Sequence, residues 1–550
     1  MFSKRSEVND VNPAVSIGIL TAAGLLCMVP FIGKSFHIDE YLFLAAAKHI
    51  LNNPMNFYGF AVNWYGWEMP MSEVMKNPPF ASYYIAAVAY LFGWGETTLH
   101  GAFLLPALAA VIGTFCLGRQ TCSQPLAAAL AALTTPVFLV SATSVMCDVL
   151  MLAFWVWAVY CWMVGLKNDR LSYLIMSSVL IACCSLTKYF GMALLPLLLV
   201  YSLYAKKKAG RWICLFLIPV SILALYNLGT QGLYGRGLLM DAAQYASNVK
   251  GISGNVLKEF LVALGFTGGC LLTCLFFSPC LWRRWVPVLG ALSILGVVLL
   301  MHWFFTGSLQ SIAGNMVFLL HMAFFIMAAV SLLAATTADV LRTKHPDALL
   351  FFLWIWGTFF FTGFFNWTIN GRSVLPMVPA ACIVLVRVMD QQGVMDKLSN
   401  KPWRWAIPLI PALLIALLVA HADRTLADTA QKAAKTIHSD MKKEKSTLWF
   451  EGHWGFQYYM EKLGGRPLDS KKMSLKAGDL VVVPRNNTNT FKLPPSSVEL
   501  KLAYRFQPFR FAATMDRTLG AGFYSNIWGP LPFAFGKAPQ ERYDLYEVIK

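Results

Sequence analysis

Long apolar segments alternate with short polar loops along most of this 550-residue chain. An apolar run crosses a bilayer as a helix when it reaches roughly 20 residues, and about thirteen runs near that length can be placed here. They cover residues 13–33, 98–118, 124–142, 146–166, 171–187, 189–205, 212–229, 257–280, 285–306, 314–338, 347–366, 373–389 and 405–421. The pattern predicts a polytopic α-helical membrane protein, in which the first run is retained because no small-residue cleavage site follows it.

The loop between the first two runs, residues 34–97, is too long for a simple turn and has helical patterns of its own. In the segment DEYLFLAAAKHIL, the apolar residues Leu42, Ala45, Ala46 and Ile50 recur at helical spacing. This spacing predicts an interfacial helix with Asp39 at or near its N-terminus. A second interfacial helix, ASYYIAAVAYLFG, is predicted after Pro79, because proline is tolerated at a helix start.

The chain changes character after residue 421, where long apolar runs stop. A charged, helix-prone connector comes first, and STLWFEGHWGFQYYMEKLGG then predicts a strand, a loop and a helix ended by two glycines. The segments GDLVVVP, VELKLAYRF and RYDLYEVIK predict further strands. We therefore expect two domains, a membrane domain over residues 1–421 and a connector with a small C-terminal α/β domain over 422–550.

Composition and charge support this class and fix an expected orientation. The chain is 57% hydrophobic and 13% charged, whereas soluble proteins carry roughly 25% charged residues. The net charge is +17, and in the membrane part Lys and Arg cluster in short loops that share one side when the N-terminus is cytoplasmic. These loops hold Lys4, Arg5, Arg119, Lys167, Arg170, Lys206, Lys207, Lys208, Arg211, Arg283, Arg284, Arg342, Lys344, Lys397, Lys401 and Arg404. The distribution argues against nucleic-acid binding and places the 34–97 loop and the C-terminal domain outside.

Five charged residues stand out on the outer side of this topology: Asp39, Glu40, Asp148, Lys188 and Arg372. Charges at the ends of membrane helices are costly unless they are paired, hydrated or functional. Simpler structural explanations stay open, since Asp39 could cap a helix, Asp148 could be a boundary charge, and the cations could snorkel. Together these residues form a candidate site that pairs outer-face carboxylates with outer-face cations.

This combination of groups suits the transfer of a sugar from a phosphate carrier to a hydroxyl. A carboxylate can take the proton of the acceptor hydroxyl, while cations or a metal stabilise the leaving phosphate. Arginine and lysine both bind phosphate well. Because nucleotides are absent outside the cytoplasm, such a donor would have to be linked to a lipid.

Successive motifs then show a resemblance to a known family. They are FHIDEYLFLAAAKHIL, KNPPFASYYIAAVAYLFGWGE, LVSATSVMCDVLML, LTKYFGMALLPLLL and GRSVLPMVPA. They resemble those of bacterial GT-C class membrane glycosyltransferases. Within this class the chain is most similar to the protein mannosyltransferase-like branch, which includes the aminoarabinose transferase of lipid A and lipopolysaccharide-core sugar transferases. The resemblance covers roughly residues 13–390.

The resemblance implies a GT-C fold and roles for individual residues. Asp39 would be the catalytic base, and Glu40 would position the base or the acceptor. Lys76 and Arg372, with Lys188 as a third cation, would contact the carrier phosphate. Asp148 would match the second acidic position of the family.

One motif departs from the family pattern. The aminoarabinose transferases carry an acidic residue directly before the lysine of a Lys-Pro-Pro stretch, whereas here Met75 precedes Lys76 and Asn77 separates it from the prolines. No donor or metal role can be transferred from that missing acid. Family members differ in their need for metal, so a divalent cation stays open as a cofactor and no metal ligands are assigned.

We therefore expect a glycosyltransferase of the bacterial inner membrane, with its site and C-terminal domain in the periplasm. Its partners would be a polyprenyl-phosphate-linked sugar and an acceptor in the envelope, either lipid A or lipopolysaccharide, another glycan, or a protein. The alternative is a transporter or flippase of lipid-linked sugars or solutes. Transporters of that kind usually have repeated halves and broken helices near the midplane, and the sequence has no internal repeat.

Overall fold

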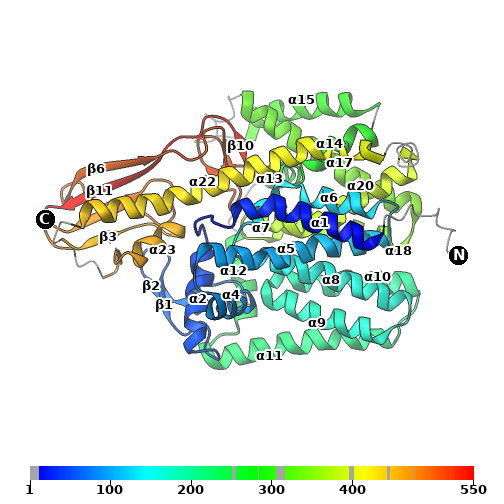
Figure 1. The fold of residues 1–550 in the computed structure, drawn as a ribbon, viewed down its shortest axis with the longest axis horizontal. Coiled ribbons are helices and arrows are strands. Elements are labelled where there is room, and N and C mark those ends of the chain that lie inside the picture. The colour runs from blue at the N-terminus through cyan, green and yellow to red at the C-terminus, as the bar shows by residue number, and fades with distance from the viewer. Residues whose placement is uncertain are drawn as a thin grey trace.

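The chain forms a bundle of long helices with a strand-containing domain at one end (Figure 1). The computed structural model describes residues 12–250, 256–282, 284–304, 316–394, 402–442, 446–472 and 475–550. In Figure 1 the strands of the C-terminal domain lie at the left end of the bundle, next to α2, β1 and β2. We call this end of the bundle the domain end.

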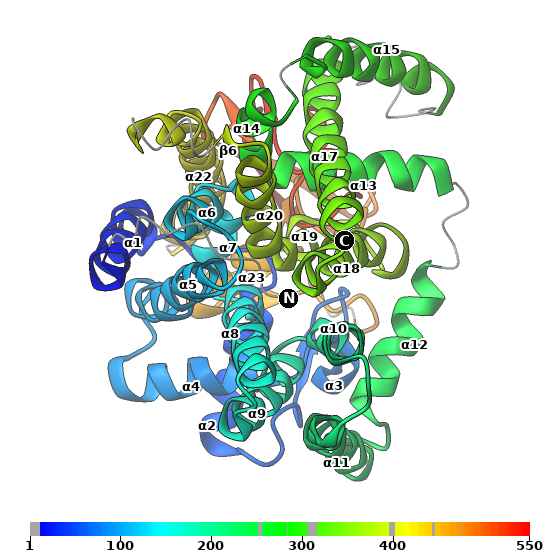
Figure 2. The ribbon, with the colours of Figure 1, turned by 90° about the vertical axis from the view of Figure 1, so that its right-hand side faces the viewer.

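The bundle is built from helices that occur at all the predicted apolar runs. They are α1 (Pro13–Met28), η1 (Val29–Phe31), α5 (Glu96–Arg119), α6 (Pro125–Leu133), α7 (Pro136–Ala142), α8 (Cys147–Lys167), α9 (Leu171–Thr187), η2 (Tyr189–Ala193), α10 (Leu194–Lys206), η3 (Arg211–Phe216), α11 (Leu217–Tyr234), α13 (Val256–Cys270), α14 (Thr273–Leu281), α15 (Val286–Phe304), α17 (Met316–Thr343), α18 (Pro346–Phe360), η5 (Phe361–Phe365), α19 (Gly371–Val374), η6 (Leu375–Met377), α20 (Val378–Gln391), η7 (Pro402–Ala406) and α22 (Leu409–Met441). Figure 2 shows the bundle end-on, with α15 at its periphery.

Nine helices of the described chain are long and apolar enough to span a membrane, or eleven when two bent pairs are each counted as one span. The predicted polytopic membrane fold is confirmed, whereas the count of thirteen is not. The runs at 124–142 and 257–280 were expected as straight helices, but α6 and α7 meet at 65° and α13 and α14 at 89°. The first bend has a clear cause, because Pro136 begins α7 and cannot continue the preceding helix.

The loop after α1 contains the two helices that the sequence predicts and a small hairpin. Its elements are α2 (Glu40–Asn52), β1 (Ala61–Asn63), β2 (Glu68–Pro70), α3 (Met71–Val74) and α4 (Phe80–Phe92). The predicted apolar face of α2, including Leu42, Ala46 and Ile50, is buried. Between the predicted apolar runs at 212–229 and 257–280 lies α12 (Leu238–Lys250), an amphipathic helix that the apolar pattern does not predict.

The described C-terminal domain contains the predicted helix and the four predicted strands, together with five two-residue strands that the sequence does not predict. Its elements are β3 (Leu448–Phe450), α23 (Trp454–Lys462), β4 (Arg466–Pro467), β5 (Leu480–Pro484), β6 (Val498–Phe506), β7 (Ala512–Ala513), β8 (Met515–Asp516), β9 (Ala521–Gly522), β10 (Ala534–Phe535) and β11 (Glu541–Val548). Five strands form one sheet in the order β4-β3-β5-β11-β6, in which β3 runs parallel to β4 and β5 while β11 runs antiparallel to β5 and β6.

The domain is joined to the bundle more tightly than a separate connector would allow. The boundary predicted at residue 421 falls inside α22, which continues to Met441 and packs against both α7 and α23. The segment between β6 and β11 returns to the bundle, where Phe533 packs on Phe325 of α17 and Phe523 O accepts a hydrogen bond from Gly371 N. These contacts bring C-terminal residues next to the predicted site.

Candidate active site

Asp39 and Arg372 form an ion pair at the domain end of the bundle. Asp39 Oδ2 lies 2.8 Å from Arg372 Nη2, although the two residues are 333 positions apart in the chain. Asp39 occupies the N-cap position of α2, but its side chain makes no capping hydrogen bond. The side chain thus faces Arg372 instead of serving the helix backbone. Within the described residues its other oxygen, Oδ1, makes no hydrogen bond.

Asp148 and Lys188 form a second ion pair in the same cluster. Asp148 lies in the first turn of α8, and its Oδ1 is 2.6 Å from Nζ of Lys188, which precedes η2. Arg372 interacts electrostatically with both Asp39 and Asp148. In the described chain, Asp148 Oδ2 and Arg372 Nε are buried and have no hydrogen-bond partner. One acceptor and one donor of the cluster are therefore left without a partner among the described residues.

Glu40 is placed differently from its neighbour. Its side chain is fully buried, with Oε2 accepting from His37 N at 2.8 Å and Oε1 from Val145 N at 2.9 Å. Burial raises the pKa of Glu40 to about 7, even though Lys34 acts in the opposite direction. Through these two hydrogen bonds Glu40 joins the start of α2 to the segment before Asp148. Its contacts therefore position two parts of the site relative to each other.

Lys76 lies in a further ionic cluster together with α12. Its Nζ is 2.5 Å from Asp241 Oδ2 and 5.2 Å from the centre of the Tyr245 ring. Tyr65 connects this cluster to the first ion pair, because it shares a hydrogen bond with Tyr245 and interacts electrostatically with Asp39. The sequence pattern singled out neither Asp241 and Tyr245 of α12 nor Tyr65. The one available signal was the need of Lys76 for an acidic partner.

A buried network supports Arg372 from the C-terminal domain. The Arg372 guanidinium lies 5.5 Å from the centre of the Tyr524 ring, and the Tyr524 hydroxyl donates to Asp423 Oδ2 at 2.9 Å. Asp423, on α22, also pairs with Lys34 at 2.6 Å, and both side chains have no exposed surface. Thr514 Oγ1 donates to Asp423 Oδ1 at 2.9 Å. This network joins the end of the first helix, the last helix and the C-terminal domain around the candidate site.

Two residues at the start of α23, His453 and Trp454, have structural contacts near the site. His453 Nδ1 lies 2.9 Å from Gln457 Oε1, and burial lowers the pKa of His453 to about 4. Trp454 packs against His37, two residues before Asp39. Within the described residues, no three His, Cys, Asp or Glu side chains lie together in an arrangement that could hold a metal ion.

The helical bundle with its strand-containing end has the GT-C fold of membrane glycosyltransferases. Residues 76–228 match the family model described as dolichyl-phosphate-mannose-protein mannosyltransferase. The resemblance drawn from the sequence motifs is thereby confirmed. The matched region contains Lys76, Asp148 and Lys188, while Asp39 and Arg372 lie outside it.

Solved structures share the architecture at low sequence identity. The oligosaccharyltransferase of Archaeoglobus fulgidus, crystallised with zinc and sulfate, is 12% identical with a TM-score of 0.50, over 85% of this chain and 68% of that one. ArnT from Cupriavidus metallidurans bound to undecaprenyl phosphate is 13% identical with a TM-score of 0.45, over 86% and 93% of the two chains. Its apo form gives 15% identity and a TM-score of 0.44, over 86% and 94%. No curated protein sequence matches the chain significantly.

Two buried acids give the C-terminal domain a predictable pH dependence. Burial raises the pKa of both Glu451 and Glu541 from 4.5 to about 7. A raised carboxyl pKa stabilises the fold below the ordinary pKa, and the contribution is lost as pH rises through 7. This contribution to the free energy of unfolding is on the order of 3 kcal/mol for each carboxyl group. We expect the thermal unfolding midpoint of the protein in detergent to fall between pH 5 and 8.

In the double variant Glu451→Gln/Glu541→Gln, the thermal unfolding midpoint should fall less between pH 5 and 8 than in wild type. Glu547→Gln, which alters a half-buried acid on the same strand as Glu541, is the matched control and should leave the pH dependence intact. An unchanged pH dependence in the double variant would mean that other groups cause the loss of stability.

Proposed function

We propose that this membrane glycosyltransferase moves a sugar from a polyprenyl-phosphate-linked donor to a hydroxyl of an envelope acceptor. The observation that carries the proposal is the Asp39–Arg372 ion pair, which joins the start of α2 to the cluster containing Asp148 and Lys188. The match to a family described by a dolichyl-phosphate-linked sugar supports a donor of this chemical class.

In this mechanism Asp39 takes the proton of the acceptor hydroxyl. Arg372 orients Asp39 through Oδ2, which leaves Oδ1 to receive that proton. The acceptor oxygen then forms a bond to the anomeric carbon of the donor sugar, while the bond between that carbon and the phosphate oxygen breaks. The leaving group is the carrier phosphate, which remains attached to its lipid.

Cations of the cluster would stabilise that phosphate as its charge develops. Arg372 keeps its Nε free, and Lys188 and Lys76 each use one of three ammonium hydrogens for a carboxylate. They can therefore contact phosphate without losing their carboxylate partners. Glu40 and Asp148 would hold the first turns of α2 and α8 in position beside the reacting groups. Further proposals are a location in the bacterial inner membrane and a periplasmic site.

Cells with and without the chain should differ in the mass of one class of envelope molecule. Mass spectrometry of envelope glycolipids and glycoproteins should show an acceptor that is heavier by one sugar only when the chain is present. Expression of the chain from a plasmid in the deletion strain should restore that mass. Unchanged glycans, together with a lipid-linked sugar or solute that accumulates on one side of the membrane, would instead support a transporter.

A further inference from the structure

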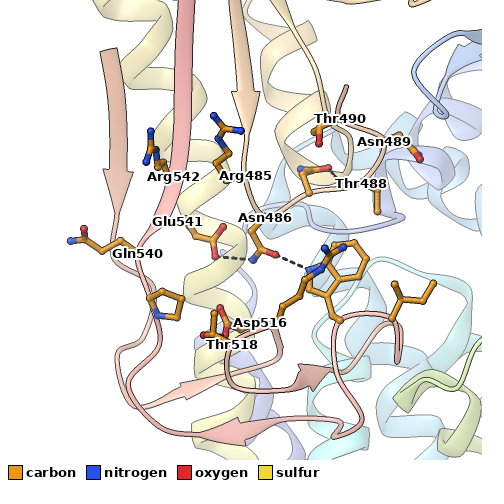
Figure 3. Close-up of a pocket in the computed structure, with 15 residues that line it drawn as sticks. Arg485, Asn486, Thr488, Asn489, Thr490, Asp516, Thr518, Gln540, Glu541 and Arg542 are labelled. Atoms are coloured by element: carbon orange, nitrogen blue, oxygen red, sulfur yellow. Dashed lines mark hydrogen bonds between the residues drawn. The ribbon is translucent and has the colours of Figure 1, made fainter. Parts of the chain in front are cut away.

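The C-terminal domain contains a polar pocket that lies outside the ion-pair cluster. It has a volume of about 560 Å³ and is lined by the loop after β5, the turn after β8, the segment around Trp528, and the residues entering β11 (Figure 3). Sites for small molecules and sugars commonly measure roughly 300–1,000 Å³. The pocket is therefore large enough for one or two sugar rings.

Two buried acids and an amide form one side of this pocket. Asp516 and Glu541 are only 6% and 7% exposed. Asn486 lies between Glu541 and Trp528, donating to Glu541 Oε1 at 2.9 Å and accepting from Trp528 Nε1 at 2.7 Å, as the dashed lines of Figure 3 show. Its orientation is fixed by these bonds. Within the described residues, Asp516 Oδ2 and Glu541 Oε2 make no hydrogen bond and can accept from a ligand.

The arginines of the pocket are largely balanced by acids. Arg485 and Arg542 both pair with the buried Asp544, at 2.5 Å and 2.6 Å. Arg517 lies over the Trp528 ring at 4.7 Å from its centre. The pocket thus offers alternating donors and acceptors beside an aromatic ring, with little excess charge of either sign. Such a lining suits the hydroxyl groups of a saccharide better than an apolar molecule or a polyanion.

Each buried acid uses one carboxylate oxygen for hydrogen bonds within the domain: Asp516 Oδ1 accepts from Thr518 and Leu519, and Glu541 Oε1 accepts from Asn486. Asp516 acts electrostatically on Glu541, and burial raises the pKa of Glu541 to about 7. Two buried carboxyl groups beside each other cost free energy unless a partner uses them. A ligand whose hydroxyls donate to their free oxygens would offset that cost.

Aromatic contacts connect the pocket to the candidate active site. Trp528 packs against Trp454 at 5.2 Å between ring centres, and Trp454 packs against His37 at 6.4 Å. His37 lies two residues before Asp39 and also contacts Tyr524, the residue under Arg372. A chain of ring contacts through Trp454, His37 and Tyr524 therefore links Trp528 of the pocket to Arg372 of the ion-pair cluster.

We propose that this pocket binds a saccharide portion of the acceptor and holds the acceptor beside the Asp39–Arg372 pair. The term acceptor rests on the proposed glycosyl transfer, whereas saccharide binding itself does not. The pocket would give the C-terminal domain a role in the choice of acceptor.

Binding can be measured on the full-length protein in detergent by isothermal titration calorimetry. The probe is the oligosaccharide fraction released by mild acid from the envelope of cells that lack the chain. Wild type and Asp39→Asn should bind it equally, because Asp39 lies outside the pocket. Asp516→Ala/Glu541→Ala should weaken binding at least tenfold. Lys537→Ala, an exposed change in the same domain, should have no effect.

Removal of buried acids could disturb the fold, so Thr490→Trp provides a second test. Thr490 is exposed at the rim, and a tryptophan there would fill the pocket without touching its buried bonds. This variant should unfold at the wild-type temperature yet lose binding at least tenfold. An absence of binding to wild type, or equal binding by wild type and Thr490→Trp, would overturn the proposal. Normal transfer by Asp39→Asn with intact pocket binding would refute only the proposed reaction.

Discussion

Asp39→Asn should lower the rate of sugar transfer by about 10²–10⁴-fold, the usual contribution of a positioned general base. Asparagine keeps the shape of the side chain and can still accept a hydrogen bond from Arg372, so α2 should stay in place. It cannot take the acceptor proton. The rate is measured as product formed per unit of protein in membrane vesicles, with mass spectrometry as the readout.

A matched control comes from the same loop. Glu68 is an exposed acid of β2 that pairs with Lys472 of the C-terminal domain at 2.7 Å. Glu68→Gln changes one carboxylate to an amide and breaks an outer-loop ion pair, yet it should retain near wild-type transfer. Equal losses of transfer rate in Asp39→Asn and Glu68→Gln would show that any negative charge in this loop affects transfer and that Asp39 is not the base.

Breaking the Lys34–Asp423 pair should produce the largest loss of stability. Both side chains are fully buried, and removal of one partner leaves an uncompensated buried charge, which costs about 3–5 kcal/mol. Asp423→Leu should therefore lower the thermal unfolding midpoint strongly, and Lys34→Met should do the same. Transfer should also fall, since Tyr524 loses its hydrogen bond to Asp423 and no longer holds its ring against Arg372.

A double-mutant cycle separates this explanation from general damage to the core. Replacement of both partners of a buried ion pair by apolar residues is often neutral. Lys34→Met/Asp423→Leu should thus be more stable than either single variant. Asp440→Asn, an exposed change on the same helix, should leave stability unchanged. If the loss of stability in the double variant equals the sum of the losses in the two single variants, Lys34 and Asp423 are not coupled.

Local periodicity made much of the fold predictable. Strands β3, β5, β6 and β11 and helix α2 occur where the sequence predicts them. The bend between α6 and α7 was missed because a run of apolar residues looks continuous across Pro136. The sequence did not predict helix α12 because the polar residues in this segment interrupt the apolar pattern.

Pairing between distant residues was beyond the sequence pattern. The topology placed Asp39 and Arg372 on one side of the membrane, but only the fold shows that their side chains meet. Lys34 gave no signal, because a lysine near a helix end usually reaches water, whereas here it is covered by the C-terminal domain and paired with Asp423. Tyr524 reaches Arg372 because the segment between β6 and β11 returns to the bundle, and no local sequence pattern predicts that return.

The central claim is that this chain moves a sugar from a lipid-linked donor through the site built on Asp39 and Arg372. Its most direct test uses purified protein in vesicles made from the envelope lipids of cells that lack the chain. Wild type should convert lipid-linked sugar and acceptor into product in equal molar amounts, while Asp39→Asn, folded and inserted to the same extent, should convert almost none. Equal product from the two proteins, or product formed without loss of lipid-linked sugar, would contradict the claim.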